Sequence, residues 1–229
     1  MAKRKLQRFA ENASFQHFFQ PGWDELNDGF PLKGKWRTEY FCNDHPIVLE
    51  LGCGKGEYTV ALAEKYPEKN FIGMDKKGAR MWVGAKASSS SGNGNVAFFR
   101  GLGENLPLIF EKDELDEIWI TFPEPQPNSP RTKKRFTSPQ FLERFRTILK
   151  KEGIIHLKTD NDELYLYTLE VIREGGHEIL YNTADLYLNP EDPEVIDVLP
   201  VKTHYEKIWL EQGLLIKYLR FRLNSGAGK

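Results

Sequence analysis

Short runs of branched and aromatic residues alternate with helical patterns along most of this chain, and no other sequence feature constrains the fold as strongly. The runs cover residues 47–51, 70–75, 95–100, 116–122 and 154–159. Helical patterns follow the runs at 47–51, 70–75 and 154–159, and another follows the run at 116–122 after a loop. Strands that alternate with helices pair in parallel, and the helices cover the faces of the sheet. The sequence therefore predicts an α/β fold around five parallel strands.

Two longer apolar segments close the predicted sheet. Residues 177–188 and 214–223 are expected to be strands, and the excursion between them contains a helical stretch. A strand pair of this kind gives a mixed sheet, in which we expect about seven strands with the last one antiparallel. Before these segments, Ser138 with Pro139 predicts a helix start, and Gly153 is expected to end that helix.

The length of 229 residues, with 40% hydrophobic content, suits one domain with one core. We divide the chain into a basic N-terminal arm at residues 1–45, a main domain at 46–224 and a tail at 225–229. The N-terminus is basic and polar, and no apolar run approaches transmembrane length, so we expect a cytoplasmic protein with no membrane association. The sequence does not distinguish a monomer from a homodimer.

Cysteine usage and charge exclude two further classes of protein. Cys42 and Cys53 have no Cys or His partners at ligand spacing, so we expect neither a disulfide framework nor a metal site. A net charge of -1 argues against a general polyanion binder. Basic residues nevertheless cluster in four places, and one such cluster is usually a solvated face. These clusters lie at residues 3–8, 33–37, 76–80 and 131–135.

A glycine-rich turn follows the first predicted strand, with Glu50 before Gly52, Gly54 and Gly56. Glycines permit a tight turn and close approach of the backbone to a ligand. The spacing differs from the G-x-G-x-x-G pattern of dinucleotide binding, and Glu50 suits an ammonium group better than a phosphate. Asp75, at the end of the second strand, can accept hydrogen bonds from ribose hydroxyls. The pattern favours S-adenosylmethionine over a nicotinamide cofactor, with a plain glycine turn as the alternative.

A proline-rich segment, FPEPQP, directly follows the fourth predicted strand. Pro123 and Pro125 fix the backbone on both sides of Glu124. Ligands of open parallel sheets bind outside the carboxyl ends of the strands. Glu124 is therefore expected to face the bound cofactor, although a stiffened loop with an incidental glutamate has the same spacing.

Taken in this order, the motifs resemble the tRNA (guanine-N7-)-methyltransferases of the bacterial single-chain type. The matching segments between residues 46 and 221 are VLELGCGKGEY with NFIGMDKKGAR, NVAFFRGLGENL, IWITFPEPQP with KKRF, GIIHLKTDN, and KTHYEKIWLEQGLLIKY. The resemblance implies a Rossmann-like SAM-dependent methyltransferase fold, with S-adenosyl-L-methionine as cofactor and tRNA as partner. The implied reaction is methylation of guanine N7 at position 46 in the variable loop.

The resemblance also assigns site residues. The implied cofactor-binding residues are Glu50, Gly52, Gly54, Gly56, Asp75, Leu102 and Glu124. The implied substrate-binding residues are Asn128, Lys133, Lys134, Arg135, Asp160, Thr203, His204, Tyr205 and Glu206. Three positions depart from the family pattern. Leu102 stands where the family commonly has an acid, Glu124 where it usually has an aspartate, and Asn128 where it has a lysine.

The implied chemistry needs positioned carboxylates and no covalent catalyst. Guanine N7 carries a lone pair at neutral pH, so its attack on a sulfonium methyl group needs no general base, and orientation must supply the rate. Carboxylates can accept hydrogen bonds from the N–H groups of guanine and stabilise the positive charge that develops. We expect Glu124 and Asp160 to be catalytic, with Glu206 as a further candidate, and the base to leave its stack. The alternatives are that Asp160 is the N-cap of the following helix and that Glu206 is a solvated acid on a helix.

Two other functions remain open from the sequence. A non-catalytic RNA-binding protein with a degenerate methyltransferase fold would accommodate the departures at Leu102, Glu124 and Asn128. A nicotinamide-dependent oxidoreductase would share the first two strands, but Glu50 and the absence of a hydride-transfer residue set disfavour it.

Overall fold

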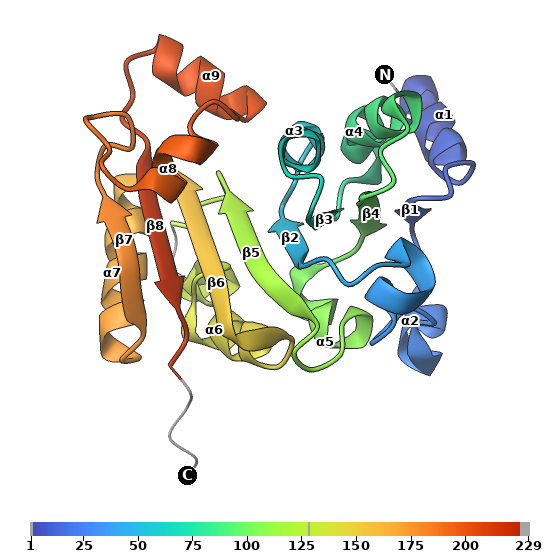
Figure 1. The fold of residues 1–229 in the computed structure, drawn as a ribbon, viewed down its shortest axis with the longest axis horizontal. Helices are drawn as coiled ribbons and strands as arrows, with labels where there is room; N and C mark the ends of the chain where they lie inside the picture. Colours follow the sequence, from blue (N-terminus) through green and yellow to red (C-terminus); the bar gives the residue numbers. More distant parts are fainter. Residues whose placement is uncertain (1, 128, 225–229) are drawn as a thin grey trace.

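A mixed sheet lies between two layers of helices in the computed structural model, which describes residues 2–127 and 129–224 (Figure 1). The strand order in this eight-stranded sheet is β1-β4-β3-β2-β5-β6-β8-β7. Strands β1 to β6 pair in parallel, and β8 is antiparallel to both β6 and β7. The strands are β1 (Phe18–Phe19), β2 (Ile47–Leu51), β3 (Asn70–Asp75), β4 (Val96–Arg100), β5 (Leu115–Thr121), β6 (Leu149–Thr159), β7 (Glu178–Thr183) and β8 (Lys217–Arg222).

The predicted α/β sheet with an antiparallel last strand is confirmed. Its eighth strand, β1, is only two residues long and pairs with the edge strand β4. The five parallel strands expected from the apolar runs correspond to β2 through β6. Sequence alternation therefore placed the centre of the sheet correctly and missed only a short strand at its edge.

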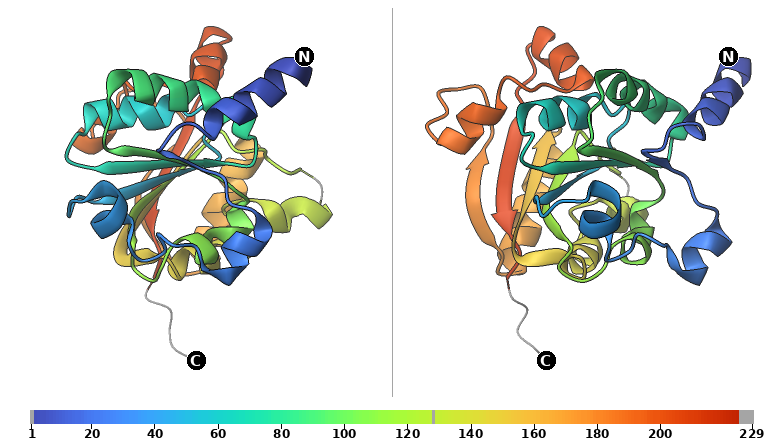
Figure 2. Two further views of the ribbon diagram at one scale, coloured as in Figure 1. Left: turned by 90° about the vertical axis from the view of Figure 1, so that its right-hand side faces the viewer. Right: turned by 45° about the vertical axis from the view of Figure 1, so that its right-hand side comes forward.

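Helices cover both faces of the sheet (Figures 1 and 2). The first face carries α1 (Ala2–Asn12), α3 (Glu57–Lys65), α4 (Gly78–Ser91) and α8 (Pro193–Val198). The second face carries α2 (Trp23–Gly29), the π-helical turn η1 (Trp36–Phe41), α5 (Leu106–Ile109), α6 (Pro139–Arg146) and α7 (Asp162–Glu174). Helix α9 (His204–Glu211) lies beyond the carboxyl end of β6, and the short turns are η2 (Gly103–Asn105) and η3 (Ser129–Lys134). No described helix has both the length and the apolarity needed to cross a bilayer.

Alternation along the central strands decides which side chains reach each face. On β2, Leu49 and Leu51 join the core under α5, α6 and α7, whereas Val48 joins the core under α3 and α4. Side chains two residues apart lie on the same face of a strand. Glu50 therefore shares a face with Val48, and Thr121, on the neighbouring strand, faces the same way. This register brings a carboxyl group and a hydroxyl group together where the two strands end.

The N-terminal helix α1 packs against α4, on the first face of the sheet. Asn12 Nδ2 donates a hydrogen bond to the Gly78 carbonyl at 2.9 Å, and Trp82 Nε1 donates to Glu11 Oε2 at 2.6 Å. The Arg8 guanidinium lies 4.6 Å from the Trp82 ring centroid. These contacts fix α1 on α4, while the division of the chain at residue 45 stays a prediction.

The expected end of the helix after Ser138 is wrong. Ser138 caps it as predicted, since its hydroxyl accepts from Phe141 N. The helix stops at Arg146, however, and Gly153 lies inside β6. A β-carbon at Gly153 would sit 2.5 Å from Leu149 Cγ, where the strand pairing with β5 shifts register. The glycine therefore serves an irregular strand and not a helix terminus.

Candidate active site

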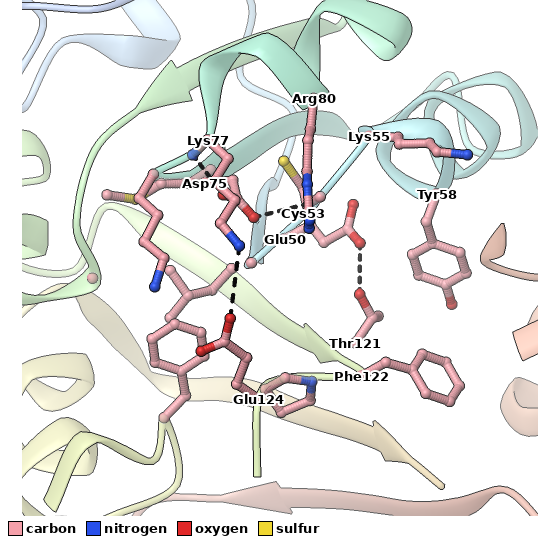
Figure 3. A pocket seen from close by; sticks show the side chains of 18 of the residues that line it. Glu50, Cys53, Lys55, Tyr58, Asp75, Lys77, Arg80, Thr121, Phe122 and Glu124 are labelled. Atoms are coloured by element: carbon pink, nitrogen blue, oxygen red, sulfur yellow. Dashed lines mark hydrogen bonds and ion pairs between the residues drawn. The ribbon is translucent and has the colours of Figure 1, made fainter. Parts of the chain in front are cut away.

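A cavity of about 420 Å³ opens at the carboxyl ends of β2, β3, β4 and β5 (Figure 3). Its wall combines the turn after β2, the end of β3, the turn after β4, the proline loop after β5 and the start of α9. Strand β2 has β3 on one side and β5 on the other, so the strand order reverses here. Ligands of open α/β sheets bind at such a reversal. The fold thus gathers segments that are far apart in the sequence around one cavity.

The glycine turn forms the floor of the cavity beside β2. Gly52, Gly54 and Gly56 all have positive φ, at 83°, 57° and 74°. A β-carbon at Gly56 would lie only 2.4 Å from the Phe98 ring, so no side chain fits there. Gly54 N donates to Asp75 Oδ2 at 3.1 Å, which ties the turn to the end of β3. The turn is therefore rigid and presents bare backbone to the cavity.

Glu50 is a buried carboxyl group in the cavity wall. Thr121 Oγ1 donates to its Oε1 at 2.7 Å, and Thr59 Oγ1 donates to its Oε2. Burial raises the pKa of Glu50 to about 7, against the opposing effect of the two threonine hydroxyls. A cationic group placed against Glu50 would favour its ionised form. The wall at this point therefore suits an ammonium group.

The raised pKa of Glu50 predicts a specific dependence of stability on pH. The folded pKa lies above the unfolded value of 4.5, so the native state holds a proton that the unfolded chain releases. The free energy of unfolding should therefore fall by roughly 3 kcal/mol as pH rises from 4.5 to 7 through this group alone. Glu50→Gln has no carboxyl group to titrate, so it should not show this loss. Urea titrations should therefore show the free energy of unfolding of the variant rising relative to that of the wild type between pH 4.5 and 7. Parallel pH profiles for the two proteins would contradict the raised pKa.

Asp75 and Leu102 bring a carboxylate and an apolar side chain to the cavity lining from the ends of the adjacent strands β3 and β4. Asp75 Oδ1 accepts from Lys77 N at 2.7 Å, and its carboxylate stays part of the cavity lining. Leu102, which is 48% exposed, lies in the turn after β4 beside Met74 and Phe136, which also line the cavity. This part of the cavity therefore offers a ligand both a carboxylate and an apolar surface. In residues 2–127 and 129–224, no group of three or more His, Cys, Asp and Glu side chains could hold a metal ion.

Glu124 lines the cavity from the proline loop, as its place after β5 predicts. The backbone turns sharply on both sides of it, because Phe122 and Gln126 have positive φ of 48° and 47°. Gln126 Nε2 donates to Glu124 Oε2 at 3.1 Å, whereas Oε1 lies 3.8 Å from Lys77 Nζ. The side chain is 63% exposed, and Figure 3 shows it reaching across the cavity toward Lys77. Its carboxylate therefore retains acceptor capacity for a ligand.

Four further predicted residues line this cavity, and the others that the structure describes do not. Thr203, His204 and Tyr205, at the start of α9, line it, and so does Lys134. Lys133 is exposed on η3. Asp160 is half-buried at the end of β6 and is not part of the lining, and its main-chain carbonyl accepts from Lys217 Nζ at 3.0 Å. Asn128 lies outside the described residues.

Arg135 and Glu206 differ from expectation, because neither faces solvent. The Arg135 side chain donates to the Pro125 carbonyl at 2.8 Å and to Glu163, and its guanidinium stacks 4.4 Å from the Tyr167 centroid. It therefore holds the proline loop from inside instead of offering a cation to a phosphate. Glu206 is 0% exposed and lies within the protein. Its contacts are described below.

The structure adds cavity residues that sequence reasoning missed. Thr59 and Thr121 hold Glu50, but buried threonines in a helix and a strand carry no sequence signal of this role. Tyr58 lines the cavity with a buried hydroxyl that has no hydrogen-bond partner among the described residues. Its position directly after the glycine motif could have indicated it. Lys77 was recognised only as part of a basic cluster.

The strand order, the glycine turn and the acids at the ends of β2 and β3 define a Rossmann-like methyltransferase of the SAM-dependent class. Solved structures share this fold at low sequence identity. The 16S rRNA methyltransferase KamB has a TM-score of 0.60 and 17% identity, with 83% of this chain and 92% of that chain covered. An antibiotic-related methyltransferase has a TM-score of 0.59 and 20% identity, with 80% and 90% covered.

Closer relatives define the family. The model of a family described as putative methyltransferase matches residues 44–219. The tRNA (guanine-N(7)-)-methyltransferase of Christiangramia forsetii is 52% identical over 97% of this chain and 99% of that protein. The enzyme of the same name from Bacteroides thetaiotaomicron is 48% identical over 97% and 87%. The chain belongs to the tRNA (guanine-N(7)-)-methyltransferase family, which confirms the resemblance seen in its motifs.

Proposed function

We propose that this protein methylates N7 of a guanine in tRNA, at position 46 of the variable loop, using S-adenosyl-L-methionine. The observation that carries the proposal is the convergence of Glu50, Asp75 and Glu124 on one cavity in a chain of this family. The first two carboxyl groups suit the cofactor, and the third projects from the mouth toward a substrate. We place the protein in the cytoplasm with its tRNA partner.

The residues of the cavity fit the proposed cofactor. Glu50 would hold the ammonium group, Asp75 the ribose hydroxyls and Leu102 the face of the adenine. The bare glycine turn leaves room for a ligand to lie against the backbone. When bound, S-adenosyl-L-methionine supplies the methyl group that is transferred.

Glu124 is the group best placed to orient the guanine. Its carboxylate can accept from the N–H groups on the Watson–Crick edge and can stabilise the positive charge that methylation creates on the ring. Adenine presents a different donor and acceptor pattern on that edge and would be rejected. N7 itself needs no proton removed, so the contribution of the protein is orientation and charge. Asp160, at the end of β6, is proposed as a second carboxylate that comes into use when RNA is bound.

Cations around the mouth suit the phosphates of an RNA. Lys134, Lys77 and Arg80 line the cavity, and Lys133 is exposed beside them. They belong to two of the basic clusters of the sequence, which the fold places on one rim although the net charge is only -1. Phosphate contacts of this kind position an RNA without reading its sequence.

The proposal predicts one methylation product at one site. Purified protein, incubated with unmodified tRNA and S-adenosyl-L-methionine, should produce 7-methylguanine that chemical cleavage maps to position 46. A tRNA with adenine at that position is the matched control and should stay unmodified. Tight cofactor binding without any 7-methylguanine would refute the proposal and favour a non-catalytic RNA-binding protein.

A further inference from the structure

A fully buried ion pair joins β6 to α9 beside the cavity. Lys158 Nζ lies 2.6 Å from Glu206 Oε1, and both side chains are 0% exposed. Lys158 is the penultimate residue of β6, and Glu206 is the third residue of α9. Removing two charges from water is costly, so such a pair usually needs a reason beyond stability.

The carboxylate of Glu206 is already occupied by donors from the protein. In addition to the ion pair with Lys158, Tyr187 donates its hydroxyl to Oε1 at 2.8 Å, and Thr203 N donates to Oε2 at 3.1 Å. Glu206 N donates in turn to Thr203 Oγ1 at 3.0 Å, which completes a capping box. A guanine could reach this buried carboxylate only if α9 moved away. Glu206 is therefore bound as part of the scaffold.

The same pair connects the two walls of the cavity. On one side, Glu206 caps the turn in which Thr203, His204 and Tyr205 line the cavity. On the other, Lys158 Nζ lies 5.3 Å from the ring centroid of Tyr58, and Tyr58 also lines the cavity. Figure 1 shows α9 lying beyond the end of β6, and the first residues of α9 line the cavity. A shift in the ion pair would therefore displace the start of α9 relative to the cavity.

We propose that Lys158 and Glu206 are positioning residues that hold the first turn of α9 at the mouth of the cavity, where it receives the RNA. In this role the Glu206 carboxylate makes no contact with the guanine. The identity of the substrate rests on the function proposed above. The role belongs to the pair, so a neutral pair that keeps the capping box should preserve it.

A double-mutant cycle tests this role directly. Glu206→Gln leaves a lone buried lysine, and Lys158→Met leaves a lone buried carboxylate. Each single variant should raise KM for tRNA at least tenfold, while the Kd for S-adenosyl-L-methionine by calorimetry stays within threefold of wild type. Glutamine is an accepted partner at this position of a capping box. The double variant Lys158→Met with Glu206→Gln should therefore return KM and kcat to within threefold of wild type.

Glu211→Gln is the matched control, because Glu211 is an exposed glutamate on the same helix, and its KM should be unchanged. Direct contact between Glu206 and guanine predicts the opposite result, in which the double variant remains as impaired as Glu206→Gln and loses kcat. That outcome would overturn the proposal. If the single variants do not fold, the double variant decides alone, and its failure to fold would also overturn the proposal.

Amide hydrogen exchange gives a readout that needs neither RNA nor methyl transfer. Residues 203–211 should exchange at least tenfold faster in Glu206→Gln than in wild type and should recover in the double variant. Residues 47–57, in β2 and the glycine turn, should be unaffected. Equal exchange of residues 203–211 in the wild type and Glu206→Gln would refute the positioning role. Because the readout is independent of activity, it separates failure of this inference from failure of the proposed function.

Discussion

Glu124→Gln is expected to lower kcat for tRNA methylation about 10²- to 10³-fold, the size of effect seen when one preorganised electrostatic group is lost. The amide keeps the shape of the side chain but loses the charge, and its N–H₂ group would oppose the N–H donors of guanine. Cofactor affinity should remain within threefold, because Glu50 and Asp75 lie on the opposite wall of the cavity. Single-turnover methylation and calorimetry measure the two quantities separately.

Glu124→Asp is the matched control for this variant. It keeps the carboxylate, shortens the side chain by one methylene and matches the residue that the family motif usually has. We expect kcat within tenfold of wild type. If Glu124→Gln retained wild-type kcat, this carboxylate would have no part in the reaction, and the proline loop would be only a rigid connection.

Residues at strand ends could be placed from the sequence, because parallel strands share one carboxyl edge. Glu50 is the penultimate residue of a predicted strand, Asp75 ends one and Glu124 follows one, and the structure brings all three to one cavity. Period-two alternation also predicts that Glu50 faces away from Leu49. These inferences need only the local pattern and a general rule of sheet topology.

Burial of charged side chains could not be predicted in the same way. Arg135 lies in a run of cations that looks solvent-exposed, yet its guanidinium packs on Tyr167 from α7. Glu206 looks like a solvated helix acid, but Lys158, 48 positions earlier in the chain, fills the space beside it. In both cases the partner comes from a distant element, so only tertiary packing determines whether the charge faces water or protein.

Leu102 stands where the family commonly has an acid, and the cavity also has apolar side chains in its lining. Leu102 lies on the wall formed with Met74 and Phe136, and it is 48% exposed there. An apolar side chain at this point can pack on the flat face of a purine, although it cannot accept a hydrogen bond. The replacement therefore changes the kind of contact that this position can make without closing the cavity.

Lys158→Met is expected to lower the free energy of unfolding by about 3–5 kcal/mol, the usual cost of leaving one buried charge without its partner. Glu206 would keep its hydrogen bonds from Tyr187 and Thr203 but would lose the cation 2.6 Å away. Urea unfolding at pH 7, followed by tryptophan fluorescence and by far-UV circular dichroism, measures the loss. A change below about 1 kcal/mol would show that the Lys158 charge does not stabilise the Glu206 carboxylate in the folded protein.

Replacing both charged side chains with apolar ones tests the stability of the protein separately from the position of α9. Buried ion pairs exchanged for apolar residues of similar volume are often as stable as the original or more so. Lys158→Met with Glu206→Leu should therefore recover most of the lost stability, yet it removes the carboxylate that completes the capping box with Thr203. A protein that is stable, binds its cofactor normally and has a raised KM for tRNA is the expected result. Since an apolar core could supply the stability, the placement of α9 is expected to depend on the capping side chain at position 206. A normal KM in this double variant would show that the start of α9 is held equally well without the pair.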